Sequence, residues 1–233
     1  MPQPTRPPIT LEGVSDEIEL RLAWSQVAPP GDRSDEVFDD VVGRHRQAHR
    51  HYHGVRHVVW VIRHVQAIAA THDRATLPFD MGVTIASAFF HDAVYHPRAT
   101  DNEERSTELA TRQLYTLGWP AERVALVGNI IVATAGHLDA SAVDGSPSAE
   151  RDVVLDADLA VLGSDPPEDA AYIIGVRAEY AHLDDEQWRD GRRGVLTALL
   201  SRAMLYRTEP ARTWWDEQAR ANMTAERAAL SAH

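Results

Sequence analysis

The stretch Ile85-Ala-Ser-Ala-Phe-Phe-His-Asp92 indicates both a buried segment of this chain and the position of a candidate functional site. Six uncharged, mostly apolar residues lead directly into a histidine and an aspartate, so two potential metal ligands end a segment that should be buried. His53 and His57 precede this stretch, and Asp158 follows it. Nitrogen and oxygen donors on separate apolar segments predict a metal-dependent hydrolase.

A second His-Asp pair, His72-Asp73, shows that the dipeptide alone is a weak signal. It follows a stretch with helical periodicity and precedes the loop-like Arg74-Ala-Thr-Leu-Pro78. We therefore interpret the second pair as a solvated helix end. The pair after residues 85–90 is the one expected to belong to a site.

Composition limits both the class of protein and the kind of metal site. A chain of 233 residues is long enough to bury a core and is expected to form one domain. It carries 35 acidic and 23 basic residues, a formal net charge of -12, which argues against a groove for long nucleic acids. Cysteine is absent, so a metal ion must be held by histidine and carboxylate side chains.

The N-terminal residues predict a tail rather than a targeting segment. Residues 1–8 are rich in proline and lack the apolar centre of a signal peptide, and no apolar run approaches the roughly 18 residues of a membrane span. We expect a cytoplasmic protein that does not enter a membrane. The sequence divides into a flexible proline-rich tail over 1–15 and one domain over 16–233.

The periodicity of apolar residues predicts an all-α fold. After Ser15 these residues recur at steps of three and four, and sustained two-residue alternation is hard to find. Pro120, Gly136 and Asp101 suit helix ends. We expect a single helical bundle of about ten helices. They are predicted over residues 16–28, 34–48, 54–72, 79–92, 102–118, 120–135, 148–163, 167–183, 186–207 and 210–230.

Two histidines upstream of the central stretch have a helical spacing. His53 and His57 are four residues apart, which places both side chains on one face of a helix. His45 and His49 continue the same step, but basic residues flank them, so we interpret those two as part of a solvated face. His57 opens the apolar run Val58-Val-Trp-Val-Ile62 and should be buried. A histidine that is hydrogen-bonded within the core is the alternative for His57.

The segment Leu155-Asp-Ala-Asp-Leu159 offers two carboxylates. A helix turns residues two positions apart to different sides, so one of them must be the ligand. A helical wheel places Asp158 within the apolar arc and Asp156 on nearly the opposite side. Asp158 is therefore the expected inward residue, and a cation is a good explanation for a buried carboxylate. An ion pair with an arginine is the alternative.

Taken together, these segments resemble the HD superfamily of metal-dependent phosphohydrolases, and the likeness covers most of the chain after Arg44. The family order of His, His-Asp and Asp appears in Tyr52-His-Gly-Val-Arg-His57, Ala88-Phe-Phe-His-Asp92 and Asp156-Ala-Asp-Leu159. The chain is most similar to small bacterial predicted HD phosphohydrolases. That closer likeness rests on Asp101-Asn-Glu-Glu104, Leu155-Asp-Ala-Asp-Leu159, Val176-Arg-Ala-Glu-Tyr180 and Gly191-Arg-Arg-Gly-Val-Leu196.

The resemblance implies an all-α HD domain and assigns roles to residues. It implies that His57, His91, Asp92 and Asp158 ligate one or two divalent ions and that His53 donates a proton. Mn, Fe, Co, Ni, Zn and Mg all accept histidine and carboxylate donors, so the sequence leaves the metal open.

Four residues are expected to bind substrate: His96, Asn102, His137 and Arg177. The first two are similar to residues of the cyclic nucleotide phosphodiesterase branch, although His96 lies one position further from the His-Asp pair. Cyclic nucleotide specificity is therefore not implied. A capping role is the alternative for His137. Arg177, like Arg192, offers forked donors that suit phosphate, and an ion pair with Glu179 or another acid is the alternative for both.

The expected activity is hydrolysis of a phosphoester or phosphoanhydride of a small molecule, with a nucleotide as the first candidate. A divalent ion lowers the pKa of bound water toward about 7 and polarises a phosphoryl oxygen. An imidazole such as that of His53 can donate a proton near neutral pH. Tryptophan and leucine residues on the terminal helices also suggest a homodimer face.

Two other functions remain open on the sequence alone. A di-iron oxygenase on the same scaffold would need more histidine ligands between His91 and Asp158, where His96 and His137 are the ones available. A noncatalytic protein that senses a nucleotide would use the same pocket without turnover.

Overall fold

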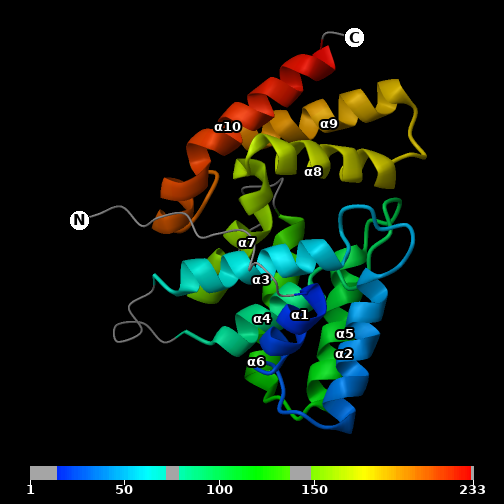
Figure 1. The fold of residues 1–233 in the computed structure, drawn as a ribbon, viewed down its shortest axis with the longest axis vertical. Coiled ribbons are helices and arrows are strands. Elements are labelled where there is room, and N and C mark those ends of the chain that lie inside the picture. Colours follow the sequence, from blue (N-terminus) through cyan, green and yellow to red (C-terminus); the bar gives the residue numbers. More distant parts are fainter. Residues whose placement is uncertain (1–14, 72–78, 137–147, 232–233) are drawn as a thin grey trace.

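The computed structural model describes residues 15–71, 79–136 and 148–231. These residues form ten α-helices and one short 3-10 helix, and no strand occurs among them, which confirms the all-α prediction (Figure 1). The helices are α1 (Asp16–Trp24), α2 (Asp32–His45), α3 (Val55–Ala69), α4 (Met81–Phe90), α5 (Asn102–Thr116), α6 (Ala121–Ala135), α7 (Ala149–Leu159), η1 (Ala160–Gly163), α8 (Pro166–Glu179), α9 (Asp185–Leu200) and α10 (Glu209–Ser231).

One predicted helix, over residues 186–207, is too long. Helix α9 ends at Leu200, and the chain then runs irregularly to α10. The backbone N–H groups of Arg207 and Thr208 donate to the buried carboxylate of Asp156, at 2.7 to 3.0 Å. Those N–H groups are therefore not available for the i to i−4 bonds of a continuing helix. The predicted tail over 1–15 lies almost wholly outside the described residues.

Helix α4 forms the centre of the larger helical layer. All of its residues from Gly82 to Phe90 are buried, and α3, α6 and α7 pack directly against it. Phe89 lies in an aromatic cluster with Trp24 and Phe38, whose ring centroids are 5.0 and 6.2 Å away. Each such side chain contributes about 1.5–3 kcal/mol on full burial, so the apolar run before His91 anchors that residue firmly.

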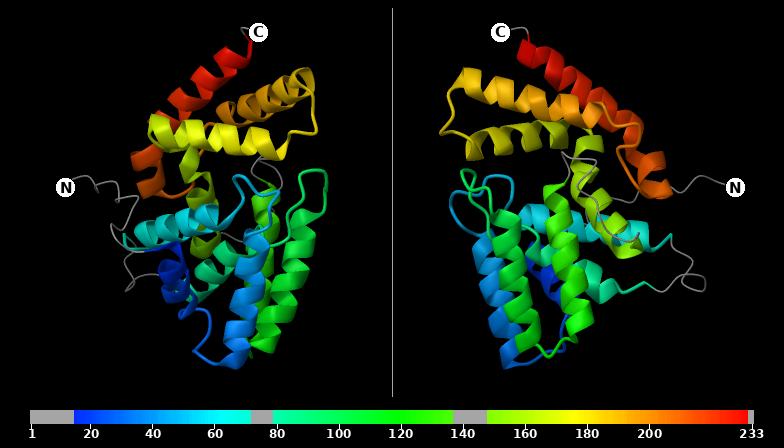
Figure 2. Two further views of the ribbon diagram at one scale, coloured as in Figure 1. Left: turned by 45° about the vertical axis from the view of Figure 1, so that its right-hand side comes forward. Right: turned by 180° about the vertical axis from the view of Figure 1, so that it is seen from behind.

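A second layer, made of α8, α9 and α10, lies across one end of the first (Figure 2). Helix α7 and η1 connect the layers, because α7 packs on α3 while η1 packs on α10. Gly163 in η1 allows a close approach to α10: a Cβ atom at this position would lie 2.5 Å from Cβ and 2.8 Å from the carbonyl oxygen of Trp215. Among the described residues, no helix has the length and apolarity needed to cross a membrane.

We expect Gly163→Ala to lower the free energy of unfolding by about 1–3 kcal/mol, because the added methyl group must push η1 away from Trp215. The matched control is Gly43→Ala in α2, where an added Cβ meets no atom within 4 Å. That change should be neutral or stabilising by up to about 1 kcal/mol, as expected for an exposed helical glycine. Urea denaturation of both variants measures the difference, and equal stabilities would contradict the packing argument.

Candidate metal centre

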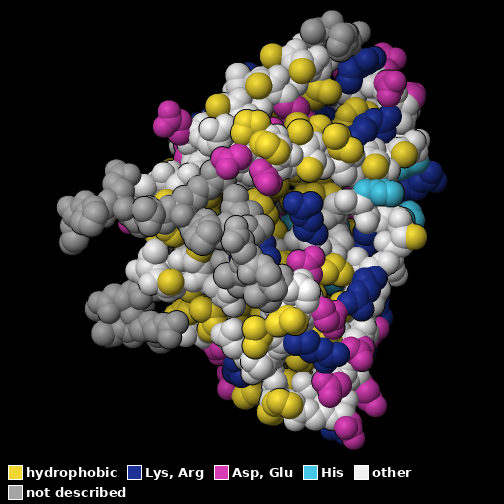
Figure 3. Space-filling model, in the orientation of Figure 1, with side chains coloured by type: hydrophobic (Ala, Val, Ile, Leu, Met, Phe, Trp, Pro, Cys, Tyr) yellow, Lys and Arg dark blue, Asp and Glu magenta, His cyan; other side chains and the backbone are white. Residues whose placement is uncertain are grey.

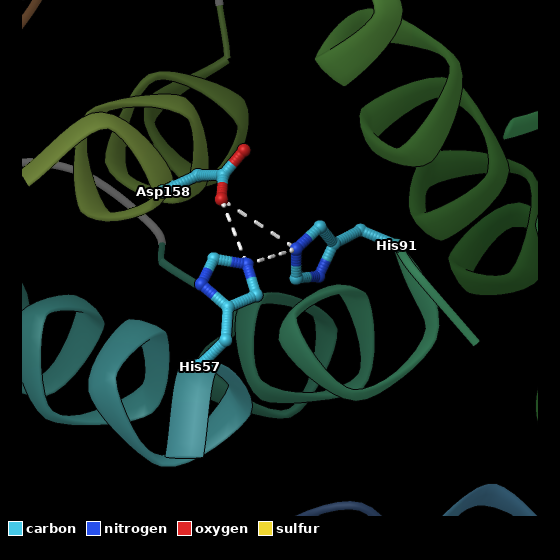
Figure 4. A group of neighbouring side chains, drawn as sticks. All are labelled: His57, His91 and Asp158. Carbon is cyan, nitrogen blue, oxygen red and sulfur yellow. Dashed lines mark hydrogen bonds and ion pairs between the residues drawn. The ribbon is translucent and has the colours of Figure 1, made fainter. Parts of the chain in front are cut away.

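Three helices bring a histidine or an aspartate each to one point between them (Figure 4). His57 lies in the first turn of α3, His91 directly follows α4, and Asp158 is the penultimate residue of α7. Each offers one ligand atom within 4.8 Å of the others. Both imidazoles are buried, whereas about 15% of the Asp158 side chain is exposed, so the cluster opens toward solvent on the carboxylate side.

The distances between these side chains suit a divalent cation. The Nε2 atoms of His57 and His91 are 3.0 Å apart, and Asp158 Oδ1 lies 3.2 and 3.5 Å from them. Ligands about 2.1 Å from an ion at octahedral or tetrahedral angles lie about 3.0–3.4 Å from one another. Oδ2 of Asp92 borders the same cluster, 3.1 Å from His91 Nε2 and 3.5 Å from His57 Nε2.

The hydrogen bonds of His91 direct a lone pair into the cluster. Its Nδ1 lies 3.0 Å from the carbonyl oxygen of Ala88, which can only accept, so Nδ1 carries a proton. In the neutral ring the Nε2 atom then has no proton and is free to bind a metal ion. An orienting bond of this kind to the distal nitrogen is the usual support of a metal-binding histidine.

The charges of the cluster require compensation. Burial disfavours protonation of His91, but the carboxylates of Asp92 and Asp158 outweigh burial and raise its pKa well above the usual value. Burial likewise opposes ionisation of Asp92, yet the neighbouring His91 and His53 hold its pKa well below the usual value. Two carboxylates facing two buried imidazoles thus attract positive charge, which protons on the imidazoles or a divalent cation can supply.

The helical wheel of α7 did not predict the burial of Asp156. Asp158 does point into the cluster, but Asp156 on the other side of the helix is even more deeply buried, with 1% exposed. It accepts the N–H groups of Arg207 and Thr208, and burial raises its pKa to about 6. Both sides of α7 are covered because this helix runs between the two layers.

His53 does not share a helix with His57, contrary to the spacing argument. Helix α2 ends at His45 and α3 begins at Val55, so His53 lies in the connecting loop. Its ring centroid is nevertheless 5.6 Å from that of His57. His45 is also not solvated as predicted: it is 2% exposed, its Nε2 lies 3.0 Å from the carbonyl oxygen of Phe89, and burial lowers its pKa to about 3.

Glu179, at the end of α8, holds His53 in place. Its Oε1 accepts the backbone N–H groups of residues 51–53 at 2.7 to 2.9 Å, and its Oε2 lies 2.6 Å from His53 Nδ1 and 3.0 Å from the hydroxyl of Tyr95. From the sequence, Glu179 is expected only as a possible partner for an arginine. An acidic residue at a helix C-terminus, where the helix dipole disfavours it, is the signal that could have identified it.

Arg50 is a second residue whose role the sequence did not reveal. It was expected near a solvated face, but it is 8% exposed. Its guanidinium donates to the carbonyl oxygens of His53, Asp92 and Ala93, at 3.0, 2.6 and 3.1 Å. Arg50 therefore ties the loop that carries His53 to the His-Asp segment.

Where the structure describes them, the expected substrate-binding residues form hydrogen bonds with residues outside this cluster. His96 is exposed, and its backbone exchanges two hydrogen bonds of 3.0 Å with the side chain of Asn102. Arg177 donates to Tyr180, Leu183 and Asp185 at the end of its own layer. His137 lies outside the described residues. Substrate binding by these four residues stays a prediction.

No protein-family model matches this chain, and no curated protein matches it. Membership of the HD superfamily therefore remains a prediction from the residues quoted above. The site has to be interpreted from its own geometry.

Two aspartates two residues apart allow a matched test of the metal centre. We expect Asp158→Ala to weaken Mn²⁺ binding by about 100-fold or more, because it removes a direct ligand, with little loss of stability. Asp156→Ala should leave metal affinity unchanged but lower the free energy of unfolding by about 2–4 kcal/mol, because two backbone N–H groups lose the buried carboxylate that accepts them. Calorimetric metal titration and urea denaturation separate the effects; the opposite pattern would refute the assignment.

The hydrogen bonds of Glu179 predict a pH-dependent contribution to stability. Burial opposes ionisation of this carboxyl, but its bond to His53 and the backbone N–H groups lower its pKa from 4.5 to about 2. The contribution, about 3 kcal/mol, is complete above pH 4.5 and is lost as the pH falls toward 2. Denaturation of the wild type and Glu179→Gln at pH 7 and pH 3 should show a difference in stability that shrinks at pH 3. A constant difference would exclude this linkage.

Proposed function

We propose that this protein is a metal-dependent phosphohydrolase of the HD superfamily that acts on a phosphoester or phosphoanhydride of a small molecule. The observation that carries the proposal is the combination of a buried cluster suited to a divalent cation with an oriented histidine beside it. His57, His91 and Asp158 would hold the ion, with Asp92 at its border. When bound, the ion supplies Lewis acidity and a water of lowered pKa.

A cavity of about 370 Å³ adjoins the cluster, and both Asp158 and His53 line it. A substrate in this cavity can therefore contact the cluster and the loop histidine together. Pockets of about 300–1,000 Å³ commonly hold small organic ligands, so the volume favours a small molecule.

His53 is placed to act as the general acid. Its Nδ1 faces the ionised carboxylate of Glu179, which leaves the Nε2 proton available for transfer. When water adds to phosphorus, the bond from phosphorus to the leaving oxygen breaks, and that oxygen takes the Nε2 proton. The Glu179 carboxylate stabilises the protonated ring before the transfer and fixes its orientation, as the orienting acid of a catalytic triad does.

The surface favours a small substrate over a long nucleic acid. The formal net charge is -12, and on the face shown in Figure 3 acidic side chains lie between the basic ones. Binding to a polyanion gains most of its affinity from clustered lysine and arginine.

The test is hydrolysis of a panel of nucleotides, phosphomonoesters, phosphodiesters and pyrophosphate, with Mn²⁺, Co²⁺, Ni²⁺, Zn²⁺ or Mg²⁺ added in turn and all products separated by chromatography. We expect turnover with at least one metal. His53→Gln should lower kcat by about 10²–10⁴-fold, the usual contribution of a general acid, with bound metal unchanged. His182→Gln, an exposed histidine after α8, is the control and should keep full activity.

Turnover that survives both chelation and Asp158→Ala would refute the proposal. Absence of hydrolysis across the whole panel, with metal bound, would do the same. In that case oxygen consumption by the iron-loaded protein would indicate an oxygenase, and nucleotide binding without turnover would indicate a sensor.

A further inference from the structure

The cavity beside the metal cluster is lined mainly by apolar side chains of both layers. Leu159, Val161 and Leu162 approach it from α7 and η1, and Val176, Val195 and Leu199 approach it from α8 and α9. Water in such a cavity gains few hydrogen bonds from the walls. An apolar group that replaces it is stabilised by about 25 cal/mol per Å² of buried surface.

The one lysine or arginine among the described lining residues is already neutralised. Arg192 donates through Nε and Nη2 to the two carboxylate oxygens of Glu226, at 2.7 and 2.9 Å, and through Nη1 to the Tyr172 hydroxyl at 3.0 Å. Its side chain is 6% exposed and that of Glu226 is 8% exposed. Binding a second phosphate here would mean breaking a buried forked ion pair, which costs several kcal/mol. The cavity is therefore unsuited to a polyphosphate chain.

Aromatic side chains at the cavity favour a ring as its occupant. The ring centroids of Tyr52 and Tyr172 lie 4.8 Å apart at 69°, and those of Tyr180 and Trp188 lie 5.9 Å apart. All four side chains line the cavity. Aromatic faces and edges of this kind pack well against a planar ligand.

The position of His53 determines which part of a substrate enters the cavity. The general acid must lie next to the leaving oxygen, and His53 lines the cavity beside the cluster. The phosphoryl group would then lie at the cluster and the leaving alcohol in the cavity.

We propose that the natural substrates are phosphoesters of an uncharged, ring-containing alcohol, with the ring of the leaving group held in this cavity. The inference rests on the proposed function and narrows it. It favours apolar phosphomonoesters over pyrophosphate and nucleoside polyphosphates.

Two glycines of α9 provide a matched test. Gly191 lines the cavity, and an added Cβ there meets no atom within 4 Å, so a larger side chain can extend toward the cavity without clashing at its base. An added Cβ at Gly194 also meets no atom within 4 Å, but Gly194 lines a separate open groove between α9 and α10. Gly191→Leu and Gly194→Leu therefore make the same chemical change at two positions of one helix that line different hollows.

The measurement compares 1-naphthylmethyl phosphate, the naphthyl ester, with methyl phosphate and pyrophosphate. Both esters release an alcohol of similar acidity, so a difference between them reports the fit of the ring in the cavity. For the wild type, kcat/KM should be at least about tenfold higher for the naphthyl ester, the discrimination expected when an apolar group fills a pocket. Gly191→Leu should lower kcat/KM for the naphthyl ester by about tenfold or more, with a smaller effect on that for methyl phosphate. Gly194→Leu should change neither. The preference of the wild type tests the inference even if one variant folds poorly.

A binding measurement separates this inference from the proposed function. Calorimetric titration of the metal-free protein with 1-naphthol should show binding to the wild type and to Gly194→Leu, and weaker binding to Gly191→Leu. This pattern without hydrolysis of any ester would refute the phosphohydrolase but keep the apolar cavity. Hydrolysis of methyl phosphate or pyrophosphate as efficiently as the naphthyl ester would overturn the inference and keep the phosphohydrolase.

Discussion

The structure depends on one costly arrangement, the burial of two imidazoles against two carboxylates at the meeting point of α3, α4 and α7. Polar groups in such a position are tolerated only when each is compensated. The apolar packing of α4 supplies the rigidity: Phe89 and Phe90 are fully buried and directly precede His91. The same hydrophobic segment thus builds the core and sets the position of the cluster.

Hydrogen bonds between residues far apart in the sequence hold the loop before α3 in place beside that cluster. Arg50 connects it to the carbonyl oxygens of Asp92 and Ala93 in the larger layer, and Glu179 connects it to the end of α8 in the smaller one. His53 is therefore held from both layers. A general acid needs this degree of fixation, because small misplacements of a reacting group slow a reaction strongly.

The meeting of the two layers also creates the cavity. Helix α7 contributes Asp158 to the cluster on one side and Asp156 to the segment before α10 on the other, so the connection between the layers and the site share one helix. The ion pair of Arg192 with Glu226 fixes α9 to α10 and removes positive charge from the cavity wall. The same contacts thus hold the helices together and determine the charge of the cavity wall.

The all-α class and the interest of His57, His91 and Asp158 follow from the sequence, because apolar periodicity and donors at the ends of apolar runs are local features. The loop position of His53, the burial of Asp156 and the roles of Arg50 and Glu179 could not be predicted in this way. These depend on contacts between distant parts of the chain: His53 and Glu179 are 126 residues apart. Local spacing carries no information about which buried partner will satisfy a charge, because the partner is chosen by the packing of the helices.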